Sequence, residues 1–284
     1  MDRHPAYPLR WYIGLDDTDD LDSAFGTGRL ARGLECLLPA GCRLRGVVRQ
    51  QLLVDPRIPY TSHNSAACLV VDAADGVQEK TLCSLAVGHI QKRSAPGSDP
   101  GLCIARADED AVSRLTAFGL ACTRRVVTQD EARSAAGRTY LEGHGGTGDG
   151  IIGAAAAVGL TAGGWSGRLI EYGRLRETPE WTTVASLEAQ GMRVVSLGRE
   201  AAVPGPEDLV WTKSWLRPRL WAGAVVVPVL PLGPGRWAML GRRKRRQANQ
   251  GEKGRAGSSE ARPEQKEEGS HGRKDLLSGA PQGR

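Results

Sequence analysis

Apolar residues follow two spacings along the first two hundred positions. Short apolar runs bounded by turn residues predict β-strands, and apolar residues three or four positions apart predict helices. The predicted strands are 10–15, 44–54, 66–71, 102–106 and 120–127. The predicted helices are 27–38, 77–90, 109–118, 129–136 and 151–160, and a β–α–β pattern resumes over 167–197. This alternation predicts an α/β (α+β) fold.

The pattern changes after residue 203. Tryptophans and prolines punctuate short apolar runs at 224–230 and 237–240, which predict a small β extension. From Arg242 onward the chain is charged and rich in Gly and Ser, so it cannot bury enough apolar surface to offset the entropy lost on ordering. We therefore expect a core over 1–200, a C-terminal β extension over 201–241 and a disordered basic tail over 242–284.

Charge along the chain is uneven. The 284 residues carry a net charge of +6, and the predicted tail alone holds 12 Lys or Arg against 6 Asp or Glu. The whole excess of positive charge therefore lies in the tail. Net charge gives no indication of a basic, nucleic-acid-binding face on the predicted core.

Cysteine spacing and hydropathy exclude two classes of protein at this stage. The six cysteines are scattered, and no two are separated by two residues as in the paired ligands of a zinc ribbon. We expect buried, reduced thiols and no zinc. No apolar run is long enough to span a bilayer, and the first ten residues have no apolar signal-peptide segment. We expect a cytoplasmic protein with no membrane partner.

An acidic turn follows the first predicted strand. Asp16, Asp17, Asp19 and Asp20 occupy four of five consecutive positions. Carboxylates this close repel one another unless a cation neutralises them. Mg²⁺ prefers oxygen ligands and is usually held by one or two carboxylates together with phosphate oxygens. We predict that Asp16, Asp17 and Asp19 hold Mg²⁺ and act in catalysis; a solvated acidic turn is the alternative.

A glycine-rich segment precedes the predicted helix 151–160. Five of the eight residues from 143 to 150 are glycine, which leaves backbone N–H groups unshielded. The helix that follows would offer further N–H donors to an anion. We predict that Gly145, Gly146, Gly148 and Gly150 bind the phosphates of a nucleotide. A flexible linker before a helix is the alternative.

Two further loops carry candidate pocket residues. His63 and Asn64 stand in a proline-stiffened loop, and Asp99 stands in a Gly/Pro loop. His63 could contact a phosphate or act as an acid or base. We predict that Asn64 and Asp99 line the nucleotide pocket. Purely structural roles for all three residues remain the alternative.

Several segments, taken in chain order, carry a family resemblance. They are IGLDDTD at 13–19, Thr27 ahead of Leu30-Ala31, Ile58-Pro59-Tyr60, Asp99-Pro100-Gly101 and GIIGA at 150–154 followed by AVG at 157–159. Together they resemble the archaeal synthetase that attaches agmatine to a cytidine in the anticodon of an isoleucine tRNA. The resemblance spans about the first 200 residues.

The resemblance implies a kinase-like ATP-using domain and a ferredoxin-like α/β domain within a catalytic core. It implies that the acidic motif handles Mg²⁺ and ATP phosphates and that Thr27 is a site of autophosphorylation. A plain helix N-cap is the alternative for Thr27. The family's tRNA-gripping OB-fold and zinc ribbon are not expected here, because the chain after Val203 is too short for a five-stranded barrel and lacks cysteine pairs.

We therefore expect an enzyme of ligase or phosphotransferase type that uses ATP and Mg²⁺ for phosphoryl or nucleotidyl transfer. The sequence does not identify the molecule that accepts the transferred group. Its catalytic residues would be Asp16, Asp17, Asp19, Thr27 and His63. A genuine tRNA-processing synthetase that modifies cytidine, with the basic tail adding affinity for RNA, is one alternative. A non-catalytic ATP-binding regulatory protein is another. The expected partners are a nucleotide and either tRNA or a small-molecule acceptor.

Overall fold

A computed structural model describes residues 7–20, 22–23, 26–59, 63–200, 202–213 and 215–240. The predicted disordered tail 242–284 lies outside the described residues, as does Tyr60 of the proline-stiffened loop. Within the described part, twelve strands form one sheet and six α-helices accompany it. This confirms the predicted mixed α/β class.

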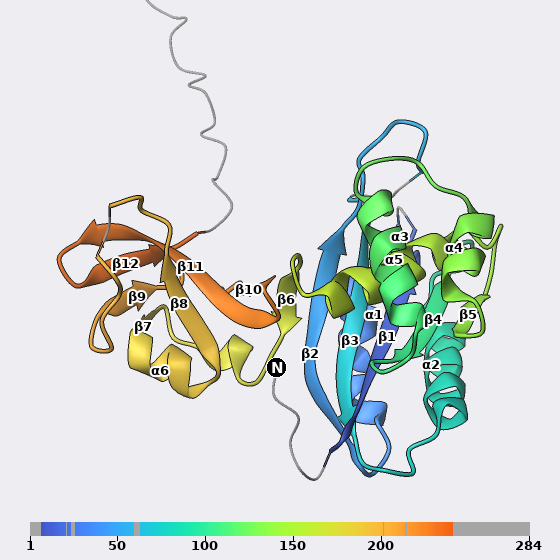
Figure 1. Cartoon of the computed structure of the whole chain (residues 1–284), viewed down its shortest axis with the longest axis horizontal. Helices are drawn as coiled ribbons and strands as arrows, with labels where there is room; N and C mark the ends of the chain where they lie inside the picture. Colours follow the sequence, from blue (N-terminus) through green and yellow to red (C-terminus); the bar gives the residue numbers. More distant parts are fainter. Residues whose placement is uncertain are drawn as a thin grey trace, which may run out of the picture. The chain divides into compact units, whose positions relative to one another are not determined.

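Five strands at one end of the sheet lie in the order β5-β4-β1-β3-β2, with every neighbouring pair antiparallel. Their bounds are β1 Leu9–Asp16, β2 Cys42–Gln51, β3 Ser65–Ala73, β4 Gly101–Arg106 and β5 Tyr140–Gly143. Helix α1 (Thr27–Gly33) connects β1 to β2, and α2 (Glu79–Arg93) connects β3 to β4. This βαββαβ order is the ferredoxin-like arrangement (Figure 1). The kinase-like part stays a prediction.

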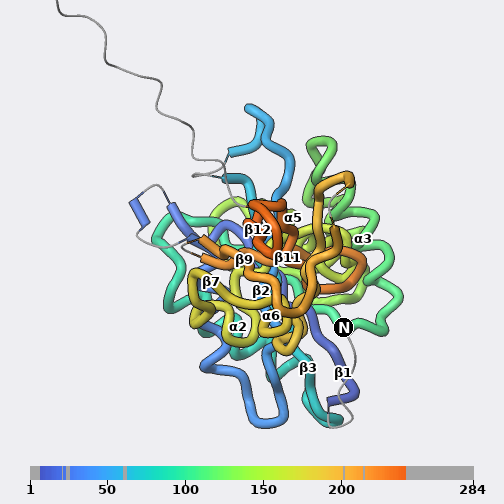
Figure 2. Tube along the Cα trace, turned by 90° about the vertical axis from the view of Figure 1, so that its left-hand side faces the viewer, coloured from blue at the N-terminus to red at the C-terminus, as the bar shows by residue number. Residues whose placement is uncertain are grey.

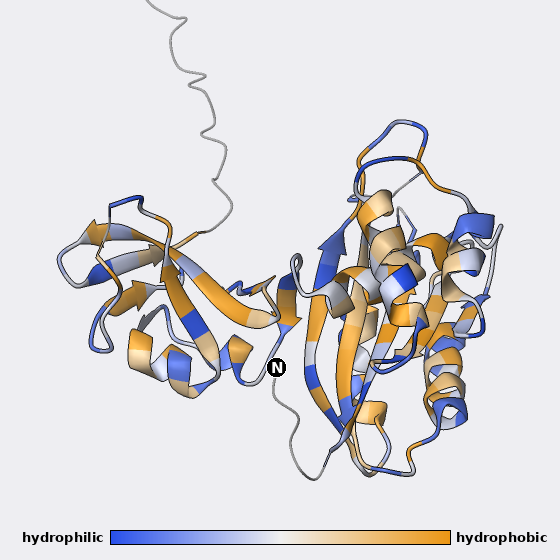
Figure 3. Cartoon of the chain, in the orientation of Figure 1, coloured by the Kyte–Doolittle hydropathy of each residue, from blue (hydrophilic) through white to orange (hydrophobic). Residues whose placement is uncertain are grey.

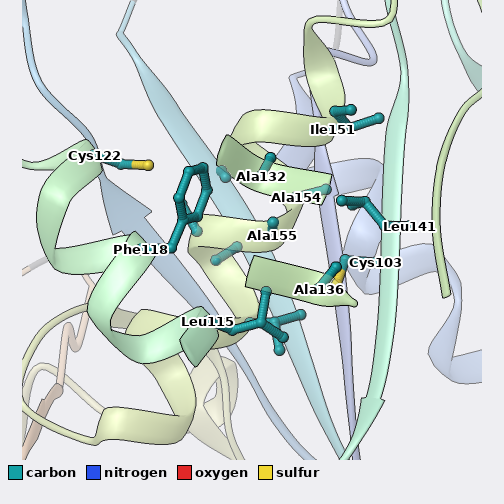
Figure 4. Packing of buried hydrophobic residues seen from close by; sticks show 14 of the residues in the cluster. Cys103, Leu115, Phe118, Cys122, Ala132, Ala136, Leu141, Ile151, Ala154 and Ala155 are labelled. Atoms are coloured by element: carbon teal, nitrogen blue, oxygen red, sulfur yellow. The ribbon is translucent and has the colours of Figure 1, made fainter. Parts of the chain in front are cut away.

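Helices cover both faces of these strands because side chains alternate along each strand. On one face, Ile13 and Leu15 of β1 pack in a cluster with residues of α1 and α2. On the other, α3 (Ala111–Cys122), α4 (Gln129–Ala136) and α5 (Gly150–Gly163) enclose a second cluster, shown in Figure 4. Strand β3 is buried along nearly its whole length and is largely hydrophobic in Figure 3.

Glycine sets how closely α5 approaches β1. A Cβ atom on Gly14 would overlap the carbonyl oxygen of Ala154, and one on Gly159 would overlap the carbonyl oxygen of Leu115 in α3. Helix α5 is buried on nearly all sides, which explains why its sequence is apolar throughout rather than on one face. The close approach brings the start of α5 to the end of β1.

The predicted strand 120–127 is wrong. Helix α3 continues to Cys122, and the described segment 123–128 holds no strand. Leu115, Phe118 and Cys122 are buried at helical spacing, whereas Leu120 is 42% exposed, so packing extends the helix past the point where the local pattern looked extended. The predicted helix 27–38 is also shorter than expected, because α1 ends at Gly33 and a 3₁₀ turn, Glu35–Leu37, follows.

The sheet continues from β2 through β6 (Arg168–Glu171) into what we call the C-terminal β module, residues 168–239. A 3₁₀ turn (Leu175–Glu177) and helix α6 (Val184–Ala189) interrupt its strands. The strands are β7 Trp181–Thr183, β8 Met192–Ser196, β9 Leu209–Trp211, β10 Arg219–Trp221, β11 Ala224–Gly233 and β12 Arg236–Met239.

One hydrophobic cluster unites this module. It includes Leu169 of β6, Leu187 of α6 and Met239 of β12, and β8 pairs in parallel with β11. Buried residues on both sides of position 200 therefore contribute to it. The predicted part boundaries at 200 and 241 stay predictions. Within the described residues, none of the helices has the length and apolar character needed to cross a membrane.

Candidate functional site

A cavity of about 390 Å³ lies where β1 ends. Its walls come from the acidic turn, the start of α1, the β2–β3 loop, the segment between α3 and α4, and the start of α5. The β2–β3 loop and the α3–α4 connection lie at the same end of the fold in both views (Figures 1 and 2), and Leu53 N–H donates to the carbonyl of Cys122 at 3.0 Å. The cavity therefore has walls from segments far apart in the sequence.

Asp16 is the innermost carboxyl of the acidic turn. It lies against the first turn of α5, where a Cβ atom on Gly153 would overlap its carboxyl group. Burial, and then the negative charge of Asp17, raise the pKa of Asp16 from an ordinary 3.8 to about 7. Gly153 is thus the residue that makes room for this carboxyl.

Asp17 turns the chain at the rim of the cavity. Its φ of 51° lies in the left-handed region, which Asp tolerates better than most residues with a Cβ atom. Burial raises the pKa of Asp17 to about 6, and the charges of Asp99, Asp19 and Asp149 raise it as well. Five carboxyl groups therefore share one region of negative potential.

Basic side chains at this cavity are paired elsewhere. Arg57 lines the wall but donates to Asp55 at 2.8 Å, and Arg125 lines it but donates to Glu131 at 2.5 Å. Among the described residues, neither Asp16 nor Asp17 forms an ion pair with Lys or Arg. Within the described part of the chain, no Lys or Arg side chain therefore balances these two carboxyl groups.

Thr27 is the first residue of α1 and faces the same cavity. Its hydroxyl donates to Asp19 Oδ1 at 3.0 Å and accepts from the hydroxyl of Thr18 at 3.1 Å. Its backbone N–H also donates to Asp19 Oδ1, at 3.1 Å. The helix N-cap is Gly26, which makes no side-chain cap bond, so the N-cap alternative for Thr27 does not describe this helix. The geometry is that of a hydroxyl held by a carboxylate.

Asp99 organises the glycine-rich loop rather than the cavity wall. Its carboxylate accepts the backbone N–H groups of Thr147, Gly148 and Asp149 at 3.0, 2.8 and 3.0 Å, and the Thr147 hydroxyl at 2.5 Å. A Cβ atom on Gly146, whose φ is 54°, would lie 2.8 Å from Asp99 Cγ. The loop therefore wraps a carboxylate of its own chain.

The predicted phosphate-binding glycines accordingly fall in two groups. Gly150 lines the cavity at the start of α5. The described wall does not include Gly145, Gly146, Gly148 or Asp99. Phosphate binding by these glycines stays a prediction, and in this structure the three N–H donors after Gly146 already have a partner in Asp99.

His63 and Asn64 both line the cavity. His63 is exposed and also borders a smaller cavity of about 130 Å³ that contains Arg49 and Thr27 in its wall. Asn64 closes the β2–β3 loop, because its Nδ2 donates to the Leu53 carbonyl at 2.6 Å and its own carbonyl accepts from Leu52 N–H at 2.9 Å. Asn64 therefore holds the loop in place through these hydrogen bonds, whether or not it also contacts a ligand.

Sequence reasoning missed several wall residues. Asp149 lines the cavity and accepts from Gln129 Nε2 at 2.7 Å, and Arg125 and Ile152 stand beside it. The sequence could have pointed to Asp149 as a site residue, since it is the one acid inside the glycine-rich segment. No local pattern in the sequence indicates Arg125, because its position at the cavity depends on where α3 ends.

The donor set fits a magnesium ion shared with phosphate. Within the described residues, no group of three or more His, Cys, Asp or Glu side chains is arranged to hold a metal ion by itself. Asp16 and Asp17 provide two carboxyl groups, while Asp19 is engaged by Thr27. Mg²⁺ needs only one or two carboxylates when phosphate and water oxygens supply the rest.

Comparison with known proteins gives partial likenesses only. No protein-family profile and no curated protein matches the chain. The structure of apo TiaS, a tRNA agmatidine synthetase, is 23% identical with a TM-score of 0.47, covering 63% of this chain and 43% of that one.

Two further structures give similar figures. A complex of TiaS with tRNA and ATP is 25% identical with a TM-score of 0.45, and a tRNA fluorescent labeling enzyme is 27% identical with the same TM-score. Each match covers 53% of this chain and 36% of the other. The chain thus spans less than half the length of these TiaS and labeling-enzyme structures, and their ligands belong to those proteins.

Proposed function

We propose that the cavity binds a nucleoside triphosphate with Mg²⁺ and transfers its terminal phosphoryl group, with Thr27 as the first acceptor. The observation that carries this proposal is the hydrogen bond from the Thr27 hydroxyl to Asp19 within a cavity that Asp16 and Asp17 also line. The cavity volume of about 390 Å³ lies within the range of about 300–1,000 Å³ that is usual for small-molecule sites.

Electrostatics supports a cation in this site. A triphosphate carries several negative charges, and a wall of carboxylates alone would repel it. Asp16 and Asp17, with raised pKa values and no basic partner among the described residues, would hold the cation. When bound, Mg²⁺ would neutralise charge on the phosphate oxygens. Gly150, at the start of α5, would add its one backbone N–H to the same anion.

The chemical step follows from the Thr27–Asp19 contact. The Thr27 oxygen attacks the terminal phosphorus, a new O–P bond forms, and the bond to the bridging oxygen breaks with release of the nucleoside diphosphate. Asp19 accepts the hydroxyl proton across the 3.0 Å hydrogen bond. Thr18, buried and donating to the Thr27 oxygen, fixes the direction of the hydroxyl.

The proposal also concerns the molecule that would receive the phosphoryl group after Thr27. The motifs shared with the tRNA agmatinylcytidine synthetase family favour tRNA and a small amine as the acceptors to try first, which would make the chain a tRNA-modifying ligase. A non-catalytic ATP-binding regulatory protein is the alternative of a different class. It would bind ATP through the same residues without turning it over.

Labelled ATP tests the proposal. The full chain is incubated with Mg²⁺ and ATP labelled at either the α or the γ phosphate, and label on the protein is mapped by peptide. We expect γ-label on the peptide that contains Thr27 in the native chain and in Thr27→Ser, and none in Thr27→Ala. Thr27→Ser is the matched control because it keeps the hydroxyl.

Other outcomes decide against the proposal in distinct ways. Label transferred from the α position, or release of AMP, would replace phosphoryl transfer by nucleotidyl transfer. Tight ATP binding by calorimetry, with no label transferred even when tRNA and amines are added, would favour the regulatory protein. Label transfer at the same rate without Mg²⁺ would contradict the assignment of Asp16 and Asp17 as ligands of the cation.

A further inference from the structure

Tryptophan is concentrated in the C-terminal β module. Five of the seven tryptophans of the chain fall between positions 168 and 239. Trp237 is buried, but Trp181 and Trp215 are 43% and 39% exposed. Large indole rings gathered on a surface are unusual unless they contact a ligand or partner. The side chains around these rings indicate which kind of ligand fits them.

Basic side chains stack on these rings. Trp181 and Trp211 stack with centroids 6.1 Å apart and planes 20° from parallel. The Lys213 ammonium lies 5.7 Å from the Trp211 ring, and the guanidinium carbons of Arg176 and Arg217 each lie 5.1 Å from the Trp215 ring. The Trp–Arg patch, as we call it, consists of Arg176, Trp181, Trp211, Lys213, Trp215 and Arg217.

Two neighbouring segments build the Trp–Arg patch. Trp181 of β7 is paired with Trp211 of β9 in the sheet, and Thr212 N–H donates to the carbonyl of Glu180 at 2.8 Å (Figure 1). Residues 180–181 and 211–212 therefore lie side by side. Main-chain pairing fixes the spacing between the Trp181 and Trp211 rings, so this part of the patch is set before any ligand arrives.

The Trp–Arg patch keeps free positive charge. Glu171 neutralises Arg176 at 2.9 Å, and Glu180 accepts the indole N–H of Trp211 at 2.8 Å. Lys213 and Arg217, in contrast, have no ion pair with an acid among the described residues, and their charges lie over aromatic faces. The patch thus combines flat apolar rings with two cations that no acid in the described part of the chain pairs with.

We propose that the Trp–Arg patch binds single-stranded nucleic acid. Unpaired bases would stack on the ring of Trp181 and against the guanidinium groups that lie over Trp215, and Lys213 and Arg217 would contact phosphates. A duplex hides its base faces and offers only base edges and phosphates, and a proline-rich peptide offers rings but no phosphate charge. Stacking needs no base-edge contact, so we expect little sequence preference. This inference is independent of the proposed chemistry at Thr27.

Binding by the full chain tests the Trp–Arg patch. Fluorescein-labelled oligo-uridine and oligo-deoxythymidine of equal length are titrated with protein, and anisotropy is followed at several salt concentrations. We expect both strands to bind, and Trp181→Leu and Trp215→Leu each to weaken binding by about fivefold or more. Replacing both Lys213 and Arg217 by Gln should lower the salt dependence by about one to two released ions.

A matched control keeps the test specific. Trp165 is 74% exposed but belongs neither to the Trp–Arg patch nor to the C-terminal β module, so Trp165→Leu should leave affinity unchanged. Circular dichroism confirms that each variant is folded. Equal affinity of the Trp181→Leu, Trp215→Leu and Trp165→Leu variants would overturn the proposal. So would tighter binding of duplex than of single strand, or binding of a proline-rich peptide with none of either oligonucleotide.

Discussion

Around Asp16 and around Trp215 the chain uses opposite means to build a surface for a ligand. At the cavity, glycine removes side chains so that backbone and carboxyl groups can approach: Gly14 admits α5, and Gly153 admits the carboxyl of Asp16. At the Trp–Arg patch, the largest side chains stay on the surface and cations lie on them. The first region is crowded and acidic, and the second is open and basic.

Because of this difference, substitutions in the two regions should have different effects on stability and on ligand binding. In the crowded region, adding one carbon forces backbone apart, so function and folding are both sensitive. In the open region, removing a ring leaves neighbours in place, so binding should change more than stability. Four predictions test this contrast.

The largest effect is expected at the acidic turn. Asp16→Asn removes one of the two carboxyl groups assigned to the cation, and we expect Mg²⁺-dependent phosphoryl transfer to fall roughly 1,000-fold, about 4 kcal/mol. Steady-state rates with ATP over a range of Mg²⁺ concentrations measure this. Asp20→Asn, in the same turn but outside the described cavity wall, is the control. Activity retained in Asp16→Asn would end the metal assignment.

The next effect is on folding. Gly14→Ala places a methyl group onto the carbonyl oxygen of Ala154, so we expect the free energy of unfolding to fall by about 3 kcal/mol. Gly88→Ala in α2 is the matched control, because a Cβ atom there meets nothing within 4 Å. That variant should be more stable by about 0.5–1 kcal/mol. Urea denaturation followed by circular dichroism separates the two.

Stability should also depend on pH through Asp16. The folded chain holds the Asp16 proton up to about pH 7, whereas the unfolded chain releases it near pH 4. Without a metal ion, the free energy of unfolding should therefore fall by about 3 kcal/mol as the pH rises from about 4 to 7. Below that window the contribution is fully present, and above it the contribution is lost.

Thermal melts across this pH range measure the Asp16 contribution. Asp16→Asn should flatten the fall, and Mg²⁺ should raise the melting temperature of the native chain more at high than at low pH. Asp17→Asn is the companion variant, since the pKa of Asp17 is raised to about 6. A fall that persists unchanged in both variants would locate the titrating group elsewhere.

The smallest effect is expected at the Trp–Arg patch. Trp181→Leu should lower the free energy of unfolding by less than about 1 kcal/mol, since the ring is largely on the surface and loses mainly its stack with Trp211. Trp237→Leu provides the contrast. Trp237 is buried and donates to Asp208 at 2.8 Å, so its loss should be larger, at about 3 kcal/mol. Similar losses in both variants would contradict the expectation that a ring can be removed from the Trp–Arg patch at little cost in stability.

Local patterns in the sequence predicted most elements, because each depends on neighbours a few residues away. Strand β1 was expected at 10–15 and runs Leu9–Asp16, and α4 was expected at 129–136 and runs Gln129–Ala136. The capping box at Thr128 and Glu131 is the kind of local signal that fixes such a boundary. The acidic turn was likewise identifiable as a candidate site from four acids within five residues.

Other features depend on residues far apart and were not predictable. The hydrogen bonds from Thr147, Gly148 and Asp149 to Asp99 span about fifty positions, so nothing near Asp99 indicates them. The end of α3 at Cys122 is decided by burial against α5, which overrides the extended appearance of 120–127. Strand order in an antiparallel sheet is also a long-range property.

The carboxylate of Asp99 has a consequence for the motion of the glycine-rich loop. A segment with five glycines should sample many conformations and exchange its amide hydrogens with solvent readily. Asp99 holds three consecutive amides, those of Thr147, Gly148 and Asp149. In heavy water these three amides should exchange their protons more slowly than the amides of Gly145 and Gly146. A segment whose composition suggests mobility would therefore open only slowly.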